Sequence, residues 1–240
     1  MGTRIKLIFL ILCVAGGAHA QSYVFGIKGG PVIATQNWNN FQRNPLFAGH
    51  AILSIETWAE DDPNSLFAQI GYHERGSSLR QNFINPTTGF SPQTNSFKFR
   101  NAGLTIGAKR KIRMGTWSPY YTLGIRGEYT FSTNLDEFVD KNFTSITTYP
   151  LNEFVEHWTY GIYAGGGTEF EISEFIGAVV ELSVLPDLGR QYYQPALNDV
   201  SVYNPYTGTT TRGLSEKTIR NVSLEISFGL RFLRKVEYID

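Results

Sequence analysis

The feature that most constrains this chain is an alternation of apolar and polar residues with a period of two. In residues 217–232, apolar side chains occupy the even positions from Val222 onwards, and polar or small residues occupy the odd positions. Residues 157–172 and 176–185 repeat the pattern. A period of two is typical of β-strands whose two faces meet different surroundings. The sequence therefore predicts an all-β protein.

The connections between such segments alternate in length. Eight alternating segments are found, at 22–34, 46–58, 66–81, 97–112, 118–131, 157–172, 176–187 and 217–232. The second, fourth and sixth connections are short, whereas the first, third, fifth and seventh are long, at 35–45, 82–96, 132–156 and 188–216. Bacterial outer-membrane barrels have short periplasmic turns and long external loops. We therefore expect an eight-stranded antiparallel transmembrane β-barrel with both chain ends on the periplasmic side.

Two alternatives to this architecture stay open. The segment 188–216 is long enough for a further hairpin, because Val200–Tyr203 and Thr209–Thr211 flank the turn-like residues Asn-Pro-Tyr-Thr-Gly. Such a hairpin would lengthen two existing strands or raise the strand count to ten. A soluble β-sandwich shows the same alternation and is the second alternative.

The first twenty residues have the pattern of a secretory signal peptide. Arg4 and Lys6 precede an apolar run, and Ala18-His19-Ala20 supplies a small-x-small cleavage site. Domain organisation is therefore predicted as a signal peptide at 1–20 and a barrel domain at 21–240. Cys13 is the only cysteine and would leave with the signal, so the mature chain has no disulfide or thiolate chemistry. These features place the protein in the bacterial outer membrane.

Charge and motif content exclude several function classes. Basic and acidic residues balance at 21 each, which gives no excess charge for neutralising the phosphates of a nucleic acid. Gly165-Gly166-Gly167 is not followed by a helix pattern, so it is not a phosphate-binding loop. We expect it to relieve crowding where a barrel strand curves. No cofactor is predicted.

The strand phase that puts apolar residues outward directs a set of charged residues into the barrel. Five are basic and five are acidic: Lys28, Glu56, Arg75, Lys109, Arg126, Glu128, Glu169, Glu181, Glu225 and Arg231. An eight-stranded barrel has an interior just wide enough for side chains. Opposite charges packed there should pair, since an unpaired buried charge is costly. The prediction is a barrel closed by salt bridges, and a small passive channel is the alternative.

The four tryptophans predict two aromatic belts. Trp58 and Trp117 lie beside short turns, whereas Trp38 and Trp158 lie beside long loops. Tryptophan is enriched at both membrane–water interfaces of such barrels. We expect one belt at each boundary of the lipid.

Some membrane barrels are enzymes, and a few residues of this chain are candidates for catalysis. Asp136, Asp140, His157 and Asp199 all lie near the long loops, but no fixed spacing links them. No metal-binding pattern such as H-E-x-x-H is present. The chain is predicted not to be an enzyme, with an outer-membrane hydrolase or acyltransferase as the remaining alternative.

Three strand motifs resemble a known family. The opening strand Phe25-Gly26-Ile27-Lys28-Gly29-Gly30 looks like the start of PorT-family outer-membrane β-barrel proteins. The strands Ala102–Lys109 and Tyr120–Gly124 are similar to the middle hairpin of that family. The resemblance implies a bacterium that uses type IX secretion, whose machinery includes the founding member as an accessory. It suggests an accessory of secretion or gliding, or a surface-binding scaffold, whose partners are membrane lipid and envelope or secretion proteins reached through the long loops.

Overall fold

The fold is known from a computed structural model that describes residues 22–38, 43–59, 62–85, 89–112, 114–138, 150–204 and 208–235. The expected signal peptide at 1–20 lies outside the described residues. Within the described ranges, no helix has the length and apolar character needed to cross a membrane.

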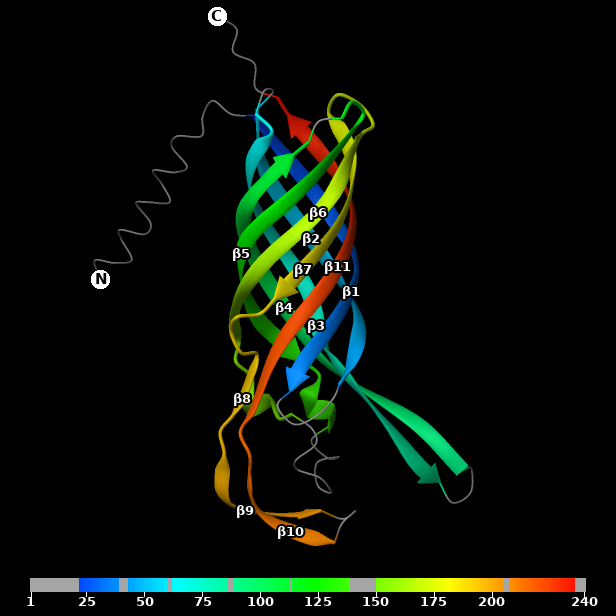
Figure 1. Cartoon of the computed structure of the whole chain (residues 1–240), viewed down its shortest axis with the longest axis vertical. Coiled ribbons are helices and arrows are strands. Elements are labelled where there is room, and N and C mark those ends of the chain that lie inside the picture. The colour runs from blue at the N-terminus through cyan, green and yellow to red at the C-terminus, as the bar shows by residue number, and fades with distance from the viewer. Residues whose placement is uncertain are drawn as a thin grey trace, which may run out of the picture.

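Eight antiparallel strands form a closed ring. They are β1 (Ser22–Trp38), β2 (Asn44–Trp58), β3 (Asn64–Asn85), β4 (Gly89–Lys111), β5 (Trp117–Thr133), β6 (Trp158–Glu171), β7 (Ile176–Pro186) and β11 (Lys217–Arg234). Each strand pairs with the next in this order, and β11 pairs with β1 to close the ring (Figure 1). Every strand predicted from the sequence is present, so the eight-stranded barrel is confirmed.

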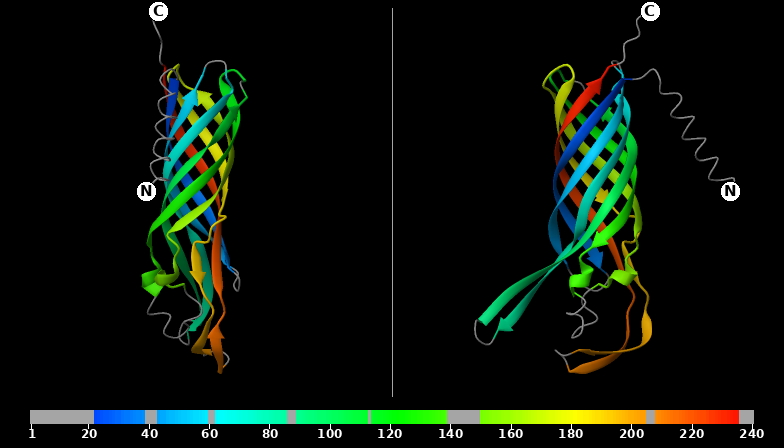
Figure 2. Two further views of the ribbon diagram at one scale, coloured as in Figure 1. Left: turned by 90° about the vertical axis from the view of Figure 1, so that its left-hand side faces the viewer. Right: turned by 180° about the vertical axis from the view of Figure 1, so that it is seen from behind.

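The two ends of the barrel differ. Short connections join β2 to β3, β4 to β5 and β6 to β7 at one end, where β1 also begins and β11 finishes; we call this the turn end. The opposite end, the loop end, carries a long β-hairpin and a second, smaller hairpin (Figure 2). The 3₁₀ helices η1 (Leu135–Phe138) and η3 (Asn152–Phe154) also lie there.

The connection expected at 82–96 is mostly strand. β3 and β4 stay paired from Ser78 opposite Ser96 out to Asn85 opposite Gly89, well beyond the ring. We call residues 79–95 the arm; it projects from the loop end in both figures. The arm was not predicted from the sequence, because a hairpin in water needs no apolar face. The alternation of apolar and polar residues that marks the membrane strands is therefore absent from the arm.

The connection expected at 188–216 contains three short strands. β8 (Tyr192–Gln194) pairs with the first residues of β11, whereas β9 (Leu197–Asn204) and β10 (Thr209–Leu214) pair only with each other in a separate two-stranded sheet. The predicted hairpin therefore exists, but it neither lengthens the ring strands nor enters the ring. The ten-strand alternative is wrong.

Candidate functional site

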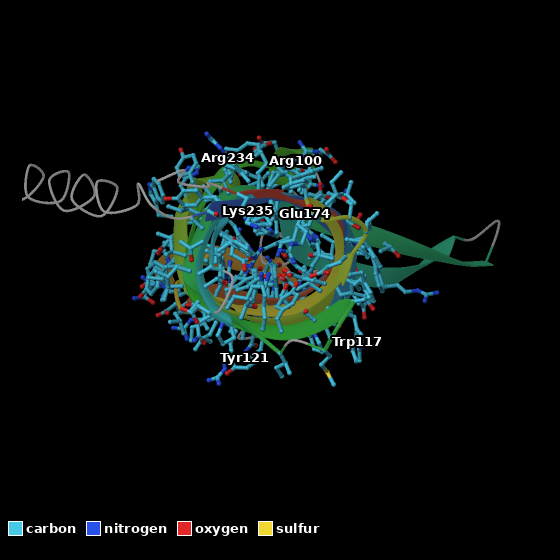
Figure 3. All side chains as sticks on the ribbon, turned by 90° about the horizontal axis from the view of Figure 1, so that it is seen from above. Arg100, Trp117, Tyr121, Glu174, Arg234 and Lys235 are labelled. Carbon is cyan, nitrogen blue, oxygen red and sulfur yellow. The ribbon has the colours of Figure 1, made fainter. Side chains whose placement is uncertain are left out.

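The surface of the barrel is inverted relative to that of a soluble protein. Outward residues such as Leu66, Leu123 and Ile125 are 62–72% exposed, whereas the charged residues Arg75 and Glu225 are fully buried. Viewed along the barrel, nitrogen and oxygen atoms gather inside the ring, while the labelled side chains of Trp117 and Tyr121 lie outside it (Figure 3). A large exposed apolar surface of this kind needs lipid around it. The chain is a small membrane-spanning β-barrel.

All ten charged residues selected from strand phase belong to an interior set of ion pairs. Lys28, Glu56, Arg75, Lys109, Arg126, Glu128, Glu169, Glu181 and Glu225 are buried, and Arg231 is nearly so, with a side chain 16% exposed. Their contacts divide into three groups along the barrel axis.

The first group, the turn-end cluster, consists of Glu56, Lys109, Lys111, Glu169 and Arg231. Lys109 Nζ donates to Glu56 Oε2 at 2.8 Å and also to Glu169. Lys111 Nζ lies 2.7 Å from Glu56 and 3.3 Å from Glu169. Arg231 donates to Glu169. Three cations therefore share two carboxylates beside the short turns.

The second group is centred on Glu181 in the middle of the barrel. Lys28 Nζ donates to Glu181 Oε1 at 2.5 Å. The hydroxyl of Tyr120 donates to Glu181 Oε2 at 2.7 Å, and the hydroxyl of Tyr163 donates to Oε1. Gly229 leaves the space that Lys28 occupies, because a Cβ atom at position 229 would lie 2.6 Å from Lys28 Cβ.

The third group, the loop-end cluster, surrounds Arg75, whose side chain is fully buried. Arg75 Nη2 donates to Glu128 Oε1 at 2.6 Å and lies 3.7 Å from Glu225, while its Nη1 lies 3.7 Å from Asp187. Arg126 contacts both Glu128, at 2.6 Å, and Asp187. Two guanidinium groups thus face three carboxylates. The turn-end cluster has one cation more than its carboxylates, so the formal charges of the arginines, lysines and carboxylates in the three groups balance.

Besides Tyr120, four members of these groups were not predicted from the sequence: His73, Lys111, Tyr163 and Asp187. His73 Nδ1 contacts Glu225 Oε1 at 2.8 Å, and its ring stacks on that of His50 with centroids 6.0 Å apart. The first three share the inward strand phase of residues that were selected, so counting by twos from Arg75, Lys109 or Glu169 would have found them. Asp187 follows the last residue of β7 and shares the inward phase of Glu181, so counting by twos from Glu181 would have found it as well.

Gly167 belongs to the three-glycine run in β6. A Cβ atom there would lie 2.9 Å from the hydroxyl oxygen of Tyr120 and would also contact the backbone oxygen of Val180. The absence of a side chain at position 167 therefore makes room for the tyrosine that bonds Glu181. Gly167 therefore relieves crowding inside the barrel. The residue that it accommodates, Tyr120, belongs to the group around Glu181.

The loop end of the interior is apolar. Phe97, Phe99, Leu135 and Phe138 pack together there, with η1 covering the opening. Beside them, Trp38 packs with Tyr192 and Ile219 and is only 6% exposed. Trp38 was expected in an outward aromatic belt, and that expectation is wrong, because its side chain points into the barrel end rather than towards lipid.

The other three tryptophans differ in exposure. Trp158, at the loop end, is 72% exposed and stacks near Tyr129, and Trp117, at the turn end, is 45% exposed. Trp58 is half-buried and lines a cleft of about 240 Å³ at the turn-end mouth together with Arg231. One outward tryptophan therefore lies at each end of the apolar surface.

The residues considered for catalysis have structural contacts of their own. His157 Nδ1 contacts the backbone oxygen of Thr130 at 2.7 Å, and Asp136 Oδ2 accepts a hydrogen bond from Asn152 at 2.9 Å. The side chains of Asp140 and Asp199 lie outside the described part of the structure. Among described residues, no group of three or more His, Cys, Asp or Glu side chains could hold a metal ion.

No family model and no curated protein matches the sequence. Among solved structures, the chain is similar to Neisserial surface protein A, at 11% identity and a TM-score of 0.45, over 88% of this chain and 96% of that one. It is also similar to Ail of Yersinia pestis, solved with the heparin analogue sucrose octasulfate (10% identity, TM-score 0.39, 89% and 99% covered). A third is the outer membrane protease OmpT of Escherichia coli (10% identity, TM-score 0.36, 89% and 95% covered). These likenesses concern the fold alone, and the fold itself is established by the closed strand ring.

Proposed function

We propose that this protein is a non-enzymatic barrel of the bacterial outer membrane that binds an envelope partner through the arm at its loop end. The observation that carries the proposal is the arm, because it is a long two-stranded structure held away from a closed barrel. The ring pairing of β3 with β2 ends at Ser78, and that of β4 with β5 ends at Phe99. Beyond those residues, Asn134 still bonds the backbone of Lys98 and Ser96. The described arm residues from Arg80 and Thr94 outwards pair in the ladder of β3 with β4.

The outer edges of the arm at residues 80–85 and 89–94 give it a binding chemistry. Unpaired edge strands present rows of backbone N–H and C=O groups that a partner strand can bond. An isolated two-stranded hairpin is also only marginally stable in water. A partner that adds a strand to the arm would bond these backbone groups and would also stabilise the hairpin. Because of the resemblance to PorT-family barrels, components of type IX secretion are the first partner class to test.

The arm is tested by replacing residues 79–95 with Asn-Gly, which joins the paired residues Ser78 and Ser96 through a two-residue turn. A matched control replaces residues 198–213 with Asn-Gly between the paired residues Leu197 and Leu214. Both variants should keep heat-modifiable migration on gels, since the ring is untouched. Crosslinking in intact envelopes should recover a partner with the parent and the control, and lose it with the arm variant. Equal recovery with all three proteins would overturn the proposal.

A small passive channel is the second candidate, and the packed interior argues against it. The cavity between Lys28, Glu181 and the turn-end cluster is about 40 Å³. That volume admits only a few water molecules, since one needs roughly 10–15 Å³ by this kind of measure. Planar-bilayer recordings of the purified protein should show no stable, ion-selective openings. Such openings would support the channel instead.

A further inference from the structure

A groove of about 820 Å³ crosses the lipid-facing side of the barrel. It runs over six strands, from β1 to β6, and its volume lies within the roughly 300–1,000 Å³ of small-molecule sites. Small outward residues form its floor, namely Ala51, Ala102 and Gly127. Its walls are larger apolar side chains, among them Leu53, Ile70, Leu104 and Phe131. The groove therefore has the shape and polarity to hold a hydrocarbon chain.

The groove lies in the half of the barrel nearer the loop end. Strand register places Tyr72 opposite Ala102, Ala102 opposite Tyr129, and Tyr129 opposite Trp158. Trp158 is the first residue of β6 at the loop end, and all three aromatic residues line the groove. Such aromatic side chains gather where lipid headgroups begin. A chain in the groove would accordingly belong to a lipid of the loop-side leaflet.

A positively charged patch stands at the loop-end margin of the groove. Arg100 is the next outward residue of β4 after Ala102, and Lys98 follows it. Both cations face a single carboxylate, since Glu74 lies 2.9 Å from Lys98 Nζ and 3.9 Å from Arg100 Nε. The side chains of Lys98 and Arg100 are 37% and 45% exposed, against 15% for Glu74. The accessible part of the patch is therefore cationic.

We propose that this surface binds one phosphate-bearing lipid of the loop-side leaflet, with an acyl chain in the groove and the phosphate at Arg100 and Lys98. The apolar groove alone would fit any hydrocarbon chain, including that of a neutral lipid. The excess positive charge at its headgroup end selects an anionic lipid. Arginine and lysine bind phosphate through charge-assisted hydrogen bonds, which arginine makes in a bidentate geometry.

The test uses the mature chain in mixed vesicles and reads the quenching of Trp158 by lipids with brominated acyl chains. Brominated phosphatidylglycerol is compared with brominated phosphatidylcholine, and the signal of Trp158→Phe is subtracted to remove the other tryptophans. We expect the anionic lipid to be preferred by about fivefold or more at low salt, because each cation near a lipid surface contributes about that factor. Equal quenching by the two lipids would overturn the proposal.

Two sets of variants test the contribution of the lipid headgroup and that of the acyl chain separately. Lys98→Gln with Arg100→Gln should abolish the preference, whereas Glu74→Gln should strengthen it by releasing both cations. If Lys98, Arg100 and Glu74 had only a structural role, all three substitutions would change the preference for the anionic lipid in the same direction. That result would contradict the assignment.

Gly127→Leu tests the groove itself. A Cβ atom at position 127 meets nothing within 4 Å, so the variant can fold while filling the floor. It should reduce quenching by both lipids. Gly49→Leu is the matched control, because Gly49 is exposed and its nearest neighbour for an added Cβ lies 3.9 Å away. Gly49 does not line the groove, and the control should behave like the parent. Unchanged quenching in Gly127→Leu would show that the chain lies elsewhere.

Discussion

Neutralising one member of the Lys28–Glu181 pair should destabilise the barrel far more than neutralising both. The two side chains are 6% and 4% exposed, and they join β1 to β7, which are not neighbours in the ring. Lys28→Met leaves the carboxylate of Glu181 with only tyrosine hydroxyl donors. Glu181→Gln leaves the ammonium group of Lys28 without its counter-charge.

The size of the effect follows from the burial of the pair. Removing one partner of a buried ion pair costs about 3–5 kcal/mol, because the other charge stays buried and uncompensated. In the double variant this pair carries no charge, and the amide that Glu181→Gln introduces can accept a hydrogen bond from one of the hydroxyls of Tyr120 and Tyr163 and donate one to the other. We expect the double variant to lose about 2 kcal/mol or less, since replacing a buried pair by neutral residues is often close to neutral. The coupling energy should then be about 4 kcal/mol or more, above the roughly 0.5–3 kcal/mol that is usual for residues in contact.

Reversible urea unfolding in phospholipid vesicles, followed by tryptophan fluorescence, measures the free energy of unfolding of the four proteins in this cycle. Exposed ion pairs contribute about 1 kcal/mol or less. If each single substitution cost no more than that, the two charges would be hydrated in the folded barrel. The closed interior would then be refuted, and the passive channel would become the better interpretation.

Three further substitutions probe other parts of the structure with the same unfolding assay. Gly229→Ala should cost about 1–3 kcal/mol, because its Cβ would press on Lys28, and a neutral result would mean that the neighbouring strand yields freely. Trp38→Ala should cost about 3–5 kcal/mol because Trp38 is a buried aromatic side chain, and a loss of about 1 kcal/mol or less would argue against its inward position. Burial lowers the pKa of Lys217, which lies beyond the ring at the start of β11, from 10.5 to about 8. Between those pH values the unfolded chain binds more protons, so the free energy of unfolding should rise with pH across that window; Lys217→Met should remove this part of the rise, and an unchanged slope would contradict it.

Strand phase predicts most of the barrel and its interior because lipid imposes a strict rule on both faces of each strand. Within the membrane the outward residue must be apolar, so the inward residue is free to be charged. Lys28, Arg75 and Glu225 could be assigned to the interior on that basis. The rule also divides the tryptophans correctly: counting by twos from Lys28 puts Trp38 inside, whereas Trp158 falls on the outward phase of β6. The expectation for Trp38 came from its nearness to a loop. That position does not indicate whether the side chain points into the barrel or towards lipid.

Beyond the lipid the rule no longer applies, and the sequence loses its periodic signal. The arm pairs through its backbone, and its polar residues resemble those of an ordinary loop. Asp187 shares the inward phase of Glu181, but its contacts with Arg75 and Arg126 could not be predicted, because those residues come from distant strands. Which cation meets which carboxylate depends on the stagger of the strands around the ring, and no short stretch of sequence contains that information.

The interior ion pairs supply a constraint that the alternation of residues cannot. Sliding a strand by two residues keeps every apolar side chain outward, so alternation excludes odd shifts of register but tolerates even ones. A shift of two residues moves a side chain by about 7 Å along the strand, which separates Lys28 from Glu181 and Arg75 from Glu128. Lys28 reaches from β1 to β7, Arg75 from β3 to β5, and Lys109 from β4 to both β2 and β6. Each pair spans strands that are not adjacent, so each one fixes two registers at once. The charged interior therefore selects one stagger of the ring among those that the lipid would accept.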